Sequence, residues 1–144
     1  MVLVSSLAAV RGARPGLTLV PRAIVEAVLL TEGFIGSAED VARRLGIRNR
    51  FALARLLKRS GLPPLHRLAG WATLLSWVRA SERNGVSLLY IAYHSHRHPS
   101  ACYRLVKEVT GLGWEAVRAR GSTWVERQMV HEILLGHRPS KNLG

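Results

Sequence analysis

The strongest constraint on the fold is an internal repeat, because the chain matches itself when it is shifted by 49 or 50 residues. Each copy contains a short helical segment, a turn, a second helical segment with the pattern Arg-x-x-Lys, and a Gly-Leu stop. The matched positions are Ala42 and Ala92, Arg55 and Arg104, Lys58 and Lys107, and the pairs Gly61-Leu62 and Gly111-Leu112. The repeat predicts two helix-turn-helix units in one chain.

Helix signals occur along the whole chain, whereas β-hairpin signals are missing. Pro21 suits the first turn of a helix, and Ser37 and Asn49 suit N-cap positions. Residues 65–82 place apolar side chains three and four apart, which indicates a long helix between the two units. We expect further helices at 21–32, 37–46, 50–60, 87–94, 99–110 and 122–135, and one within 111–121. The sequence therefore predicts an all-α protein with about seven helices and a C-terminal helix.

These signals divide the chain into a repeated middle part and two ends. The expected boundaries are 1–20 for a leader, 21–121 for the repeated part, about 37–61 and 86–111 for its two units, about 64–83 for the linker helix, and 122–144 for a C-terminal helix and tail. The leader has an apolar run without a preceding basic residue, which is the wrong order for a secretory signal. We predict that the leader is flexible.

The chain is strongly basic, and its charge is uneven. Lysine and arginine number 21 against 9 aspartate and glutamate, which gives a formal net charge of +12. Residues 37–84 alone hold 10 basic and 3 acidic side chains. Such a balance points to a polyanionic partner, with nucleic acid the first candidate and a membrane surface the second. The single cysteine requires no oxidising compartment, so a cytoplasmic location is expected.

The repeated part, from about residue 22 to residue 120, resembles the DNA-binding domain of the AraC/XylS transcriptional regulators. The resemblance rests on VARRLGIRNRFALARLLKRSGL in the first copy and IAYHSHRHPSACYRLVKEVTGLGWEAVRARG in the second. The positions that fall on the family pattern are Ile91, Ala92, Cys102, Arg104, Val106, Lys107, Gly111 and Arg118. The resemblance implies two homeodomain-like helix-turn-helix subdomains joined by a linker helix, in a regulator of the stand-alone type.

The chain departs from the family pattern in both turns. The second turn has Ser95-His96 where Gly-Phe is usual, and it is one residue shorter. The first copy has one extra residue before Asn49 and one fewer between Lys58 and Gly61. These changes bear on the angle and depth at which each recognition helix would enter a groove.

Three histidines and the cysteine lie close together near the second turn. They are His94, His96, His98 and Cys102, and imidazole nitrogen and thiolate sulfur are the ligands that zinc prefers. The resemblance places Cys102 on the inner face of the second recognition helix, and Pro99 lies between it and the turn. We therefore expect no metal. The histidines are interpreted as a polar turn beside phosphate, with a base or phosphate contact by one of them as the alternative.

The resemblance also assigns DNA contacts. Arg55 and Arg104 match the family arginines that point toward base edges, where a guanidinium binds guanine O6 and N7 together. The expected base contacts are Arg50, Phe51, Ala54, Arg55, Ser100 and Arg104. The expected phosphate contacts are Arg43, Arg44, Arg48, Asn49, Lys58, Arg97, His98 and Lys107. Three alternatives stay open: phosphate or an internal carboxylate as the partner of either arginine, a core position for Phe51, and a solvated face for the other cations.

The sequence therefore predicts a transcriptional regulator, an activator by resemblance, that binds double-stranded DNA sequence-specifically as a monomer in the bacterial nucleoid. RNA polymerase is the expected protein partner, and no membrane partner is expected. The sequence lacks a Gly-rich phosphate loop, H-E-x-x-H and G-x-S-x-G, so we predict neither an enzyme nor a cofactor. The alternatives are sequence-indifferent binding of nucleic acid and a protein-interaction module that acts through the C-terminal helix, 122–135.

Overall fold

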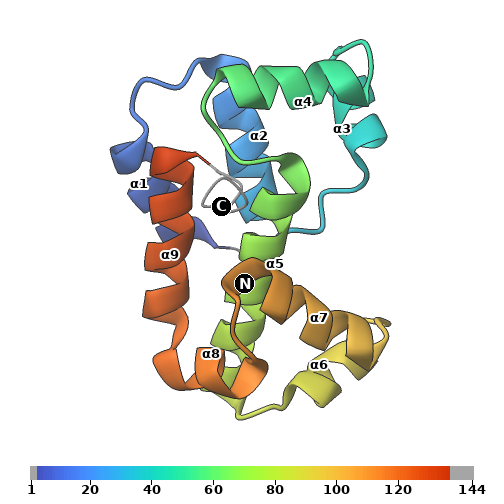
Figure 1. Ribbon diagram of the computed structural model, residues 1–144, viewed down its shortest axis with the longest axis vertical. Helices are drawn as coiled ribbons and strands as arrows, with labels where there is room; N and C mark the ends of the chain where they lie inside the picture. Colours follow the sequence, from blue (N-terminus) through green and yellow to red (C-terminus); the bar gives the residue numbers. More distant parts are fainter. Residues whose placement is uncertain (1–2, 137–144) are drawn as a thin grey trace, which may run out of the picture.

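The computed structural model describes residues 3–136, and every regular element in that range is a helix (Figure 1). The helices described are α1 (Val4–Ala13), α2 (Leu19–Leu30), α3 (Ala38–Arg44), α4 (Arg50–Arg59), α5 (Leu65–Asn84), α6 (Leu88–His94), α7 (Pro99–Thr110), α8 (Trp114–Arg120) and α9 (Ser122–Leu135). The predicted all-α class is confirmed. The predicted tail at 137–144 lies outside the described residues.

The long central helix α5 carries the core. Its side chains are buried on every side, as expected for a helix that other helices surround, and they include Leu74, Leu75 and Val78, none of which is exposed. Helices α2, α7 and α9 all pack against it. At Gly70, an added Cβ would lie 2.9 Å from Val109 Cγ2, so the absence of a side chain there lets α7 approach α5 closely. The predicted linker helix is therefore also the central element of the fold.

The two predicted helix-turn-helix units are α3–α4, called the first unit, and α6–α7, called the second unit. All four helices begin with a side-chain cap. Ser37 Oγ accepts a hydrogen bond from the backbone N–H of Asp40, and Ser87 Oγ accepts one from the backbone N–H of Tyr90, each at 3.1 Å. Asn49 accepts one at 2.9 Å for α4, and His98 Nδ1 accepts one at 3.2 Å for α7. The caps therefore recur in both units, and they fix where each recognition helix starts.

The turns of the two units differ in length, as the sequence predicted. Five residues, 45–49, separate α3 from α4, whereas four residues, 95–98, separate α6 from α7. Both turns nevertheless begin alike. The N–H of Ile47 donates to the carbonyl oxygen of Ala42 at 2.8 Å, and the N–H of Arg97 donates to that of Ala92 at 3.0 Å. The missing residue therefore falls after this shared bond and just before α7.

The shared turn requires a left-handed backbone, and the two units meet this requirement with different residues. The first unit places Gly46 there, with φ of 72°, and the second places His96 there, with φ of 56°. Glycine adopts this conformation without a steric penalty, whereas a residue with a Cβ does so at a cost. The second turn is therefore the more strained of the two.

This difference predicts opposite effects for a pair of substitutions. Because His96 is exposed, His96→Gly is expected to stabilise the protein by about 0.5–1 kcal/mol. Gly46→Ala is expected to destabilise it by about 1 kcal/mol, through backbone strain alone, since no atom lies within 4 Å of the added Cβ. Urea unfolding of both variants measures the effects. Equal shifts of the same sign would contradict the interpretation.

Helix α1 corrects the prediction of a flexible leader at 1–20. Leu3 and Val10 are buried, and α1 packs against α2 and α9. Ser6 Oγ donates to Glu126 Oε2 at 2.5 Å, across 120 residues of sequence. The sequence did not show a partner for the apolar residues of α1, because that partner, α9, follows the repeated part of the chain.

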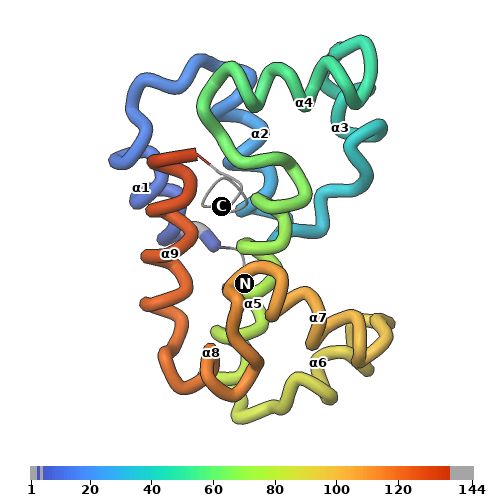
Figure 2. Tube along the Cα trace, in the orientation of Figure 1, coloured from blue at the N-terminus to red at the C-terminus, as the bar shows by residue number. Residues whose placement is uncertain are grey.

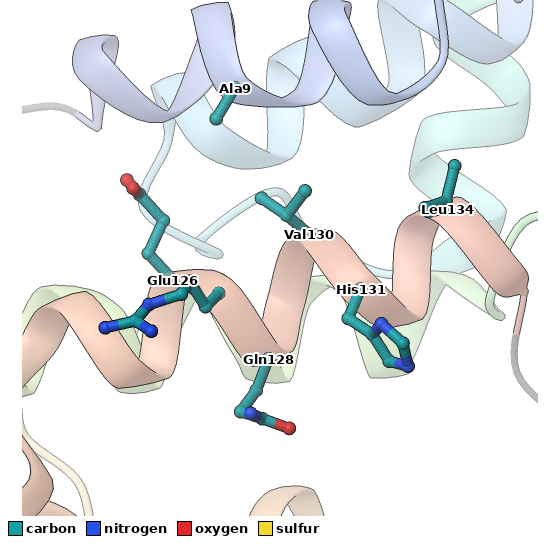
Figure 3. Close-up of a pocket in the computed structure, with 7 residues that line it drawn as sticks. Ala9, Glu126, Gln128, Val130, His131 and Leu134 are labelled. Carbon is teal, nitrogen blue, oxygen red and sulfur yellow. The ribbon is translucent and has the colours of Figure 1, made fainter.

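Helices α1 and α9 lie side by side, on the opposite side of the picture from α3 and α6 (Figure 2). Figure 3 shows this contact, with Glu126, Val130 and Leu134 on the side of α9 toward α1, and Gln128 and His131 pointing the other way. The apolar residues Val125, Met129 and Ile133 of α9 are buried. The main apolar face of the predicted C-terminal helix is therefore occupied within the chain itself.

None of the helices among residues 3–136 combines the length and the apolar character that a membrane span requires.

Candidate nucleic-acid interface

One face of α4 presents four of the nine predicted contacts of the first unit. Phe51, Ala54, Arg55 and Lys58 follow each other at spacings of three, one and three residues, so they share a face, and all four are exposed. Arg50 is exposed beside them, with its guanidinium carbon 4.9 Å from the centre of the Phe51 ring. The opposite face of α4 packs Leu53 and Leu57 into the core.

Phe51 is 59% exposed, so the alternative that it belongs to the core is wrong. More than half of the residue is accessible, and its ring lies beside the Arg50 guanidinium. Because a ring of this kind can contact a thymine methyl group, the position suits a DNA contact.

The same face of α7 presents the predicted contacts of the second unit. Ser100, Arg104 and Lys107 are exposed, and they correspond to Phe51, Arg55 and Lys58 at an offset of 49 residues. The inner face carries Cys102, Val106 and Val109, which are buried, as the family pattern predicted for Cys102. The sequence repeat therefore becomes a repeat of exposed and buried faces.

Tyr103 is a member of this face that the sequence interpretation missed. It lies at the position that Ala54 occupies in the first unit, and 47% of it is exposed. Applying the 49-residue offset to Ala54 would have found it. A phenol beside Arg104 adds an aromatic surface and a hydroxyl group that can donate or accept a hydrogen bond.

Most of the predicted cationic contacts have no anionic partner in the described part of the chain. Within residues 3–136, no ion pair joins Arg55, Lys58, Arg104 or Lys107 to a carboxylate. Internal carboxylates as the partners of these arginines are therefore not observed there. Four cations left in this way on two matching faces form a surface suited to a polyanion.

Arg43 is the exception among the predicted phosphate contacts. Its guanidinium pairs with Asp40 Oδ1 at 2.5 Å on the surface of α3. A hydrogen bond from Arg43, and to a smaller extent one from Ser37, lowers the pKa of the Asp40 carboxyl below its usual value. An exposed pair of this kind is weak, so Arg43 can exchange Asp40 for a phosphate at little cost.

Four of the remaining predicted contacts make interactions within the chain. Asn49 and His98 are the N-caps of α4 and α7, and the Ser100 hydroxyl lies 2.7 Å from His98 Nδ1. Arg97 is half-buried, with its guanidinium carbon 5.6 Å from the centre of the Trp77 ring. These residues therefore have defined contacts at the starts of α4 and α7. Arg44 and Arg48 are exposed.

The two units differ in charge. Residues 38–59 contain seven basic and two acidic side chains, whereas residues 88–110 contain three basic and one acidic. At the positions of Arg43 and Arg44, the second unit has Tyr93 and His94. The first unit therefore has the higher net positive charge of the two.

The histidines and the cysteine near the second turn do not converge. His94, His96 and His98 are exposed, whereas Cys102 is buried beneath α7. No group of three or more possible metal ligands occurs among residues 3–136. Burial raises the pKa of the Cys102 thiol, which Arg97 opposes only in part. A neutral buried thiol packs as a small apolar group.

Replacing this thiol is expected to affect folding. Cys102→Ser should destabilise the protein by about 1–3 kcal/mol, because it buries a hydroxyl group without a partner. The wild-type thiol also predicts a pH effect. Since its folded pKa is raised, its contribution is complete below the unfolded pKa of about 8.5 and is lost as the pH rises through the higher folded value. Thermal unfolding at pH 7 and pH 10 tests both points, and an alkaline loss that Cys102→Ser retains would contradict the second.

Two arginines that the sequence interpretation missed hold the far ends of the recognition helices. Arg14, which follows α1, donates to the carbonyl oxygens of Ser60, of Gly61 at 3.0 Å and of Ile133 at 2.8 Å. It therefore ties the end of α4 to α9. The last carbonyl groups of a helix lack partners within the helix, so a guanidinium is well matched to them.

Arg67 does the same for α7. Its guanidinium donates to the carbonyl oxygens of Glu108 at 2.8 Å and Val109 at 2.9 Å. It also binds both carboxylate oxygens of Glu132 on α9, at 2.7 and 2.9 Å, in a pair that is largely buried. Helix α9 is thus connected to the ends of both recognition helices. Neither arginine has a sequence signal, because its partners lie far along the chain.

No protein-family model, curated protein or solved structure matches the chain.

Proposed function

We propose that the protein binds double-stranded DNA sequence-specifically as a monomer and regulates transcription, in the manner of the AraC/XylS regulators that its repeat resembles. The observation that supports this is the matched pair of exposed faces on α4 and α7, each with an arginine and a lysine at the same helical positions. An activator of this type would contact RNA polymerase beside its DNA site. In this proposal, the recognition helices enter successive major grooves on one side of the duplex.

The length of α5 agrees with this arrangement. Its 20 residues extend over about 30 Å, and successive major-groove faces recur every ~34 Å. A single chain can then contact two half-sites in the way that a dimer usually does. The fixed caps at Asn49 and His98 set the ends of the recognition helices that lie nearest the bases in helix-turn-helix proteins.

Selection of bound duplexes from a random pool tests the proposal directly. The expected result is an enriched motif with two parts about one helical turn apart. A pool that stays random after several rounds would contradict sequence-specific binding. A footprint of the full chain on the selected duplex then shows whether both parts are covered.

The two matched arginines provide the sharper test. Arg55→Ala and Arg104→Ala are each expected to cost about 1–3 kcal/mol on the selected site and much less on unrelated duplex, because a bidentate contact to guanine is lost. Each variant should relax the preference in one half of the site only. Fluorescence anisotropy with selected, half-mutated and unrelated duplexes measures this.

Lys58→Ala is the matched control for a phosphate contact on the same helix. It should weaken binding to all duplexes alike, and lower the slope of log affinity against log salt by about 0.9. If Arg55→Ala and Arg104→Ala behave like Lys58→Ala, base contact by the arginines is wrong.

The uneven charge favours a second candidate, in which the first unit alone binds duplex without regard to sequence. Tyr93 and His94 stand where the first unit has two arginines, so the second unit attracts phosphate less. In that case, the protected region would be only one half-site long, and the protein would bind unrelated duplexes with similar affinity.

A further inference from the structure

A groove of about 750 Å³ lies between α4 and the start of α5, beside the loop that precedes α3. Its floor consists of the buried Leu53, Leu57, Leu62 and Leu65. The volume falls within the range of about 300–1,000 Å³ that is typical of small-molecule sites. Such sites combine an apolar floor with a few polar groups at defined places, so the rim of the groove decides what it can bind.

The rim is cationic and aromatic. Arg50, Lys58 and His66 lie around the opening, and all three are exposed. Phe51 adds a ring beneath the Arg50 guanidinium. No Asp or Glu lines the groove. Glu39 Oε1 accepts a hydrogen bond from the backbone N–H of Arg50 at 3.1 Å, so this contact does not involve the Arg50 guanidinium.

Two other depressions in the described residues lack this combination. The one between α1 and α9, of about 540 Å³, is lined by Glu126 next to Arg127 (Figure 3). The one between α5, α7 and α9, of about 790 Å³, contains Arg67, which is already bound to Glu132. The groove beneath α4 therefore stands apart, because its cations surround an apolar floor and have no carboxylate partner among residues 3–136.

We propose that this groove binds a small amphipathic anion, with an aromatic or branched apolar body and one carboxylate, and that the bound anion excludes DNA. The apolar body would lie on the leucine floor, and the carboxylate would pair with Arg50 and Lys58. The second part rests on the proposed function, since Arg50, Phe51, Ala54 and Lys58 line the groove and are also predicted DNA contacts. Ligand and DNA would then compete for the same side chains.

Binding is tested first without DNA, on the full chain. The probe is 1-pyrenebutyrate, and 1-pyrenebutanol is its neutral match with the same ring system. Pyrene fluorescence gives the affinity, and amide chemical shifts of labelled protein locate the site. The expected result is binding of the carboxylate at least about fivefold tighter than that of the alcohol, with shifts at the groove residues. Equal affinity for the two probes, or shifts elsewhere, would overturn the proposal.

A filled groove provides the matched variant. Ala69 forms part of the wall, is half-buried, and is not a predicted DNA contact, so Ala69→Leu should reduce probe affinity about tenfold or more by occupying the space. Ala9→Leu makes the same change in the depression between α1 and α9, and should leave probe affinity unchanged. Ala38→Leu, on another wall, serves where Ala69→Leu does not fold. Unchanged probe binding in a folded groove variant would overturn the site.

Competition is tested second, and its outcomes separate the two proposals. On the selected duplex, the probe should raise the apparent dissociation constant of the wild type in proportion to probe concentration, but not that of Ala69→Leu. Probe binding in the groove with no effect on DNA affinity would overturn the competition and leave the site. Probe binding in the groove by a protein that enriches no duplex motif would overturn the proposed function and the competition with it. DNA binding without any probe binding would overturn the groove proposal alone.

Discussion

Inserting ~5 base pairs between the two halves of the selected site is expected to weaken binding by about 100-fold or more. Such an insertion turns one half-site to the far side of the duplex, so only one recognition helix can remain in its groove. The two units are joined through α5, so following this rotation would require the central helix to deform. Leu74, Leu75 and Val78 of α5 are fully buried, so such a deformation would disturb the packing of the core.

An insertion of ~10 base pairs is the informative control. It returns the second half-site to the same side of the duplex but moves it ~34 Å further away. A rigid monomer whose linker helix has 20 residues should still bind weakly, whereas a dimer or a flexible chain would recover its affinity. Electrophoretic mobility shifts on the three duplexes measure this. Equal affinity for all three would mean that the two units do not act together.

The helices were predictable because their signals are local. Ser37 and Asn49 cap α3 and α4 as predicted, since a cap depends only on a side-chain oxygen and the next turn of backbone. The one-residue difference between the two turns was also visible in the sequence. The failure at α1 has the opposite cause. Its burial depends on contact with α9, and no local pattern in residues 1–20 shows that such a partner exists.

The exposed faces of the recognition helices were predictable in the same way, from one repeat. For Phe51 the sequence left two positions open, because an aromatic residue there fits either the core or the surface. The packing of Leu53 and Leu57 on the opposite side of α4 shows that Phe51 is on the surface. Tyr103 was missed even though the repeat marks its position. The groove beneath α4 was not predictable at all, since its walls come from four separate segments.

The ion pair between Arg67 and Glu132, called the brace, could not be predicted from the sequence either. Breaking it is the second change for which we expect a large effect. Arg67→Ala is expected to lower the free energy of unfolding by about 2–4 kcal/mol, because it removes one member of a largely buried ion pair and the donor of two helix-terminal carbonyl groups. For a domain of this size, that corresponds to a fall in melting temperature of about 4–15 °C. Urea and thermal unfolding measure the change.

Arg11→Ala is the matched control, because it breaks another bidentate pair between an arginine and a glutamate. Arg11 binds Glu26 at 2.8 and 3.0 Å, but its side chain is 58% exposed. Hydrogen bonding to Arg11 also lowers the pKa of Glu26, yet exposed pairs of this kind add little to the stability of a protein. An equal loss of unfolding free energy in the two variants would mean that the brace stabilises the protein no more than an exposed ion pair does.

The position of Arg67 predicts a further consequence for DNA binding. It holds the carbonyl end of α7 against α9, and Arg14 holds the carbonyl end of α4 against the same helix. At a temperature where Arg67→Ala is still folded, its footprint should retain the half-site of the first unit and lose protection over that of the second. Arg14→Ala should show the reverse pattern. If both variants weaken the two half-sites equally, the arginines support the fold as a whole and do not position one recognition helix each.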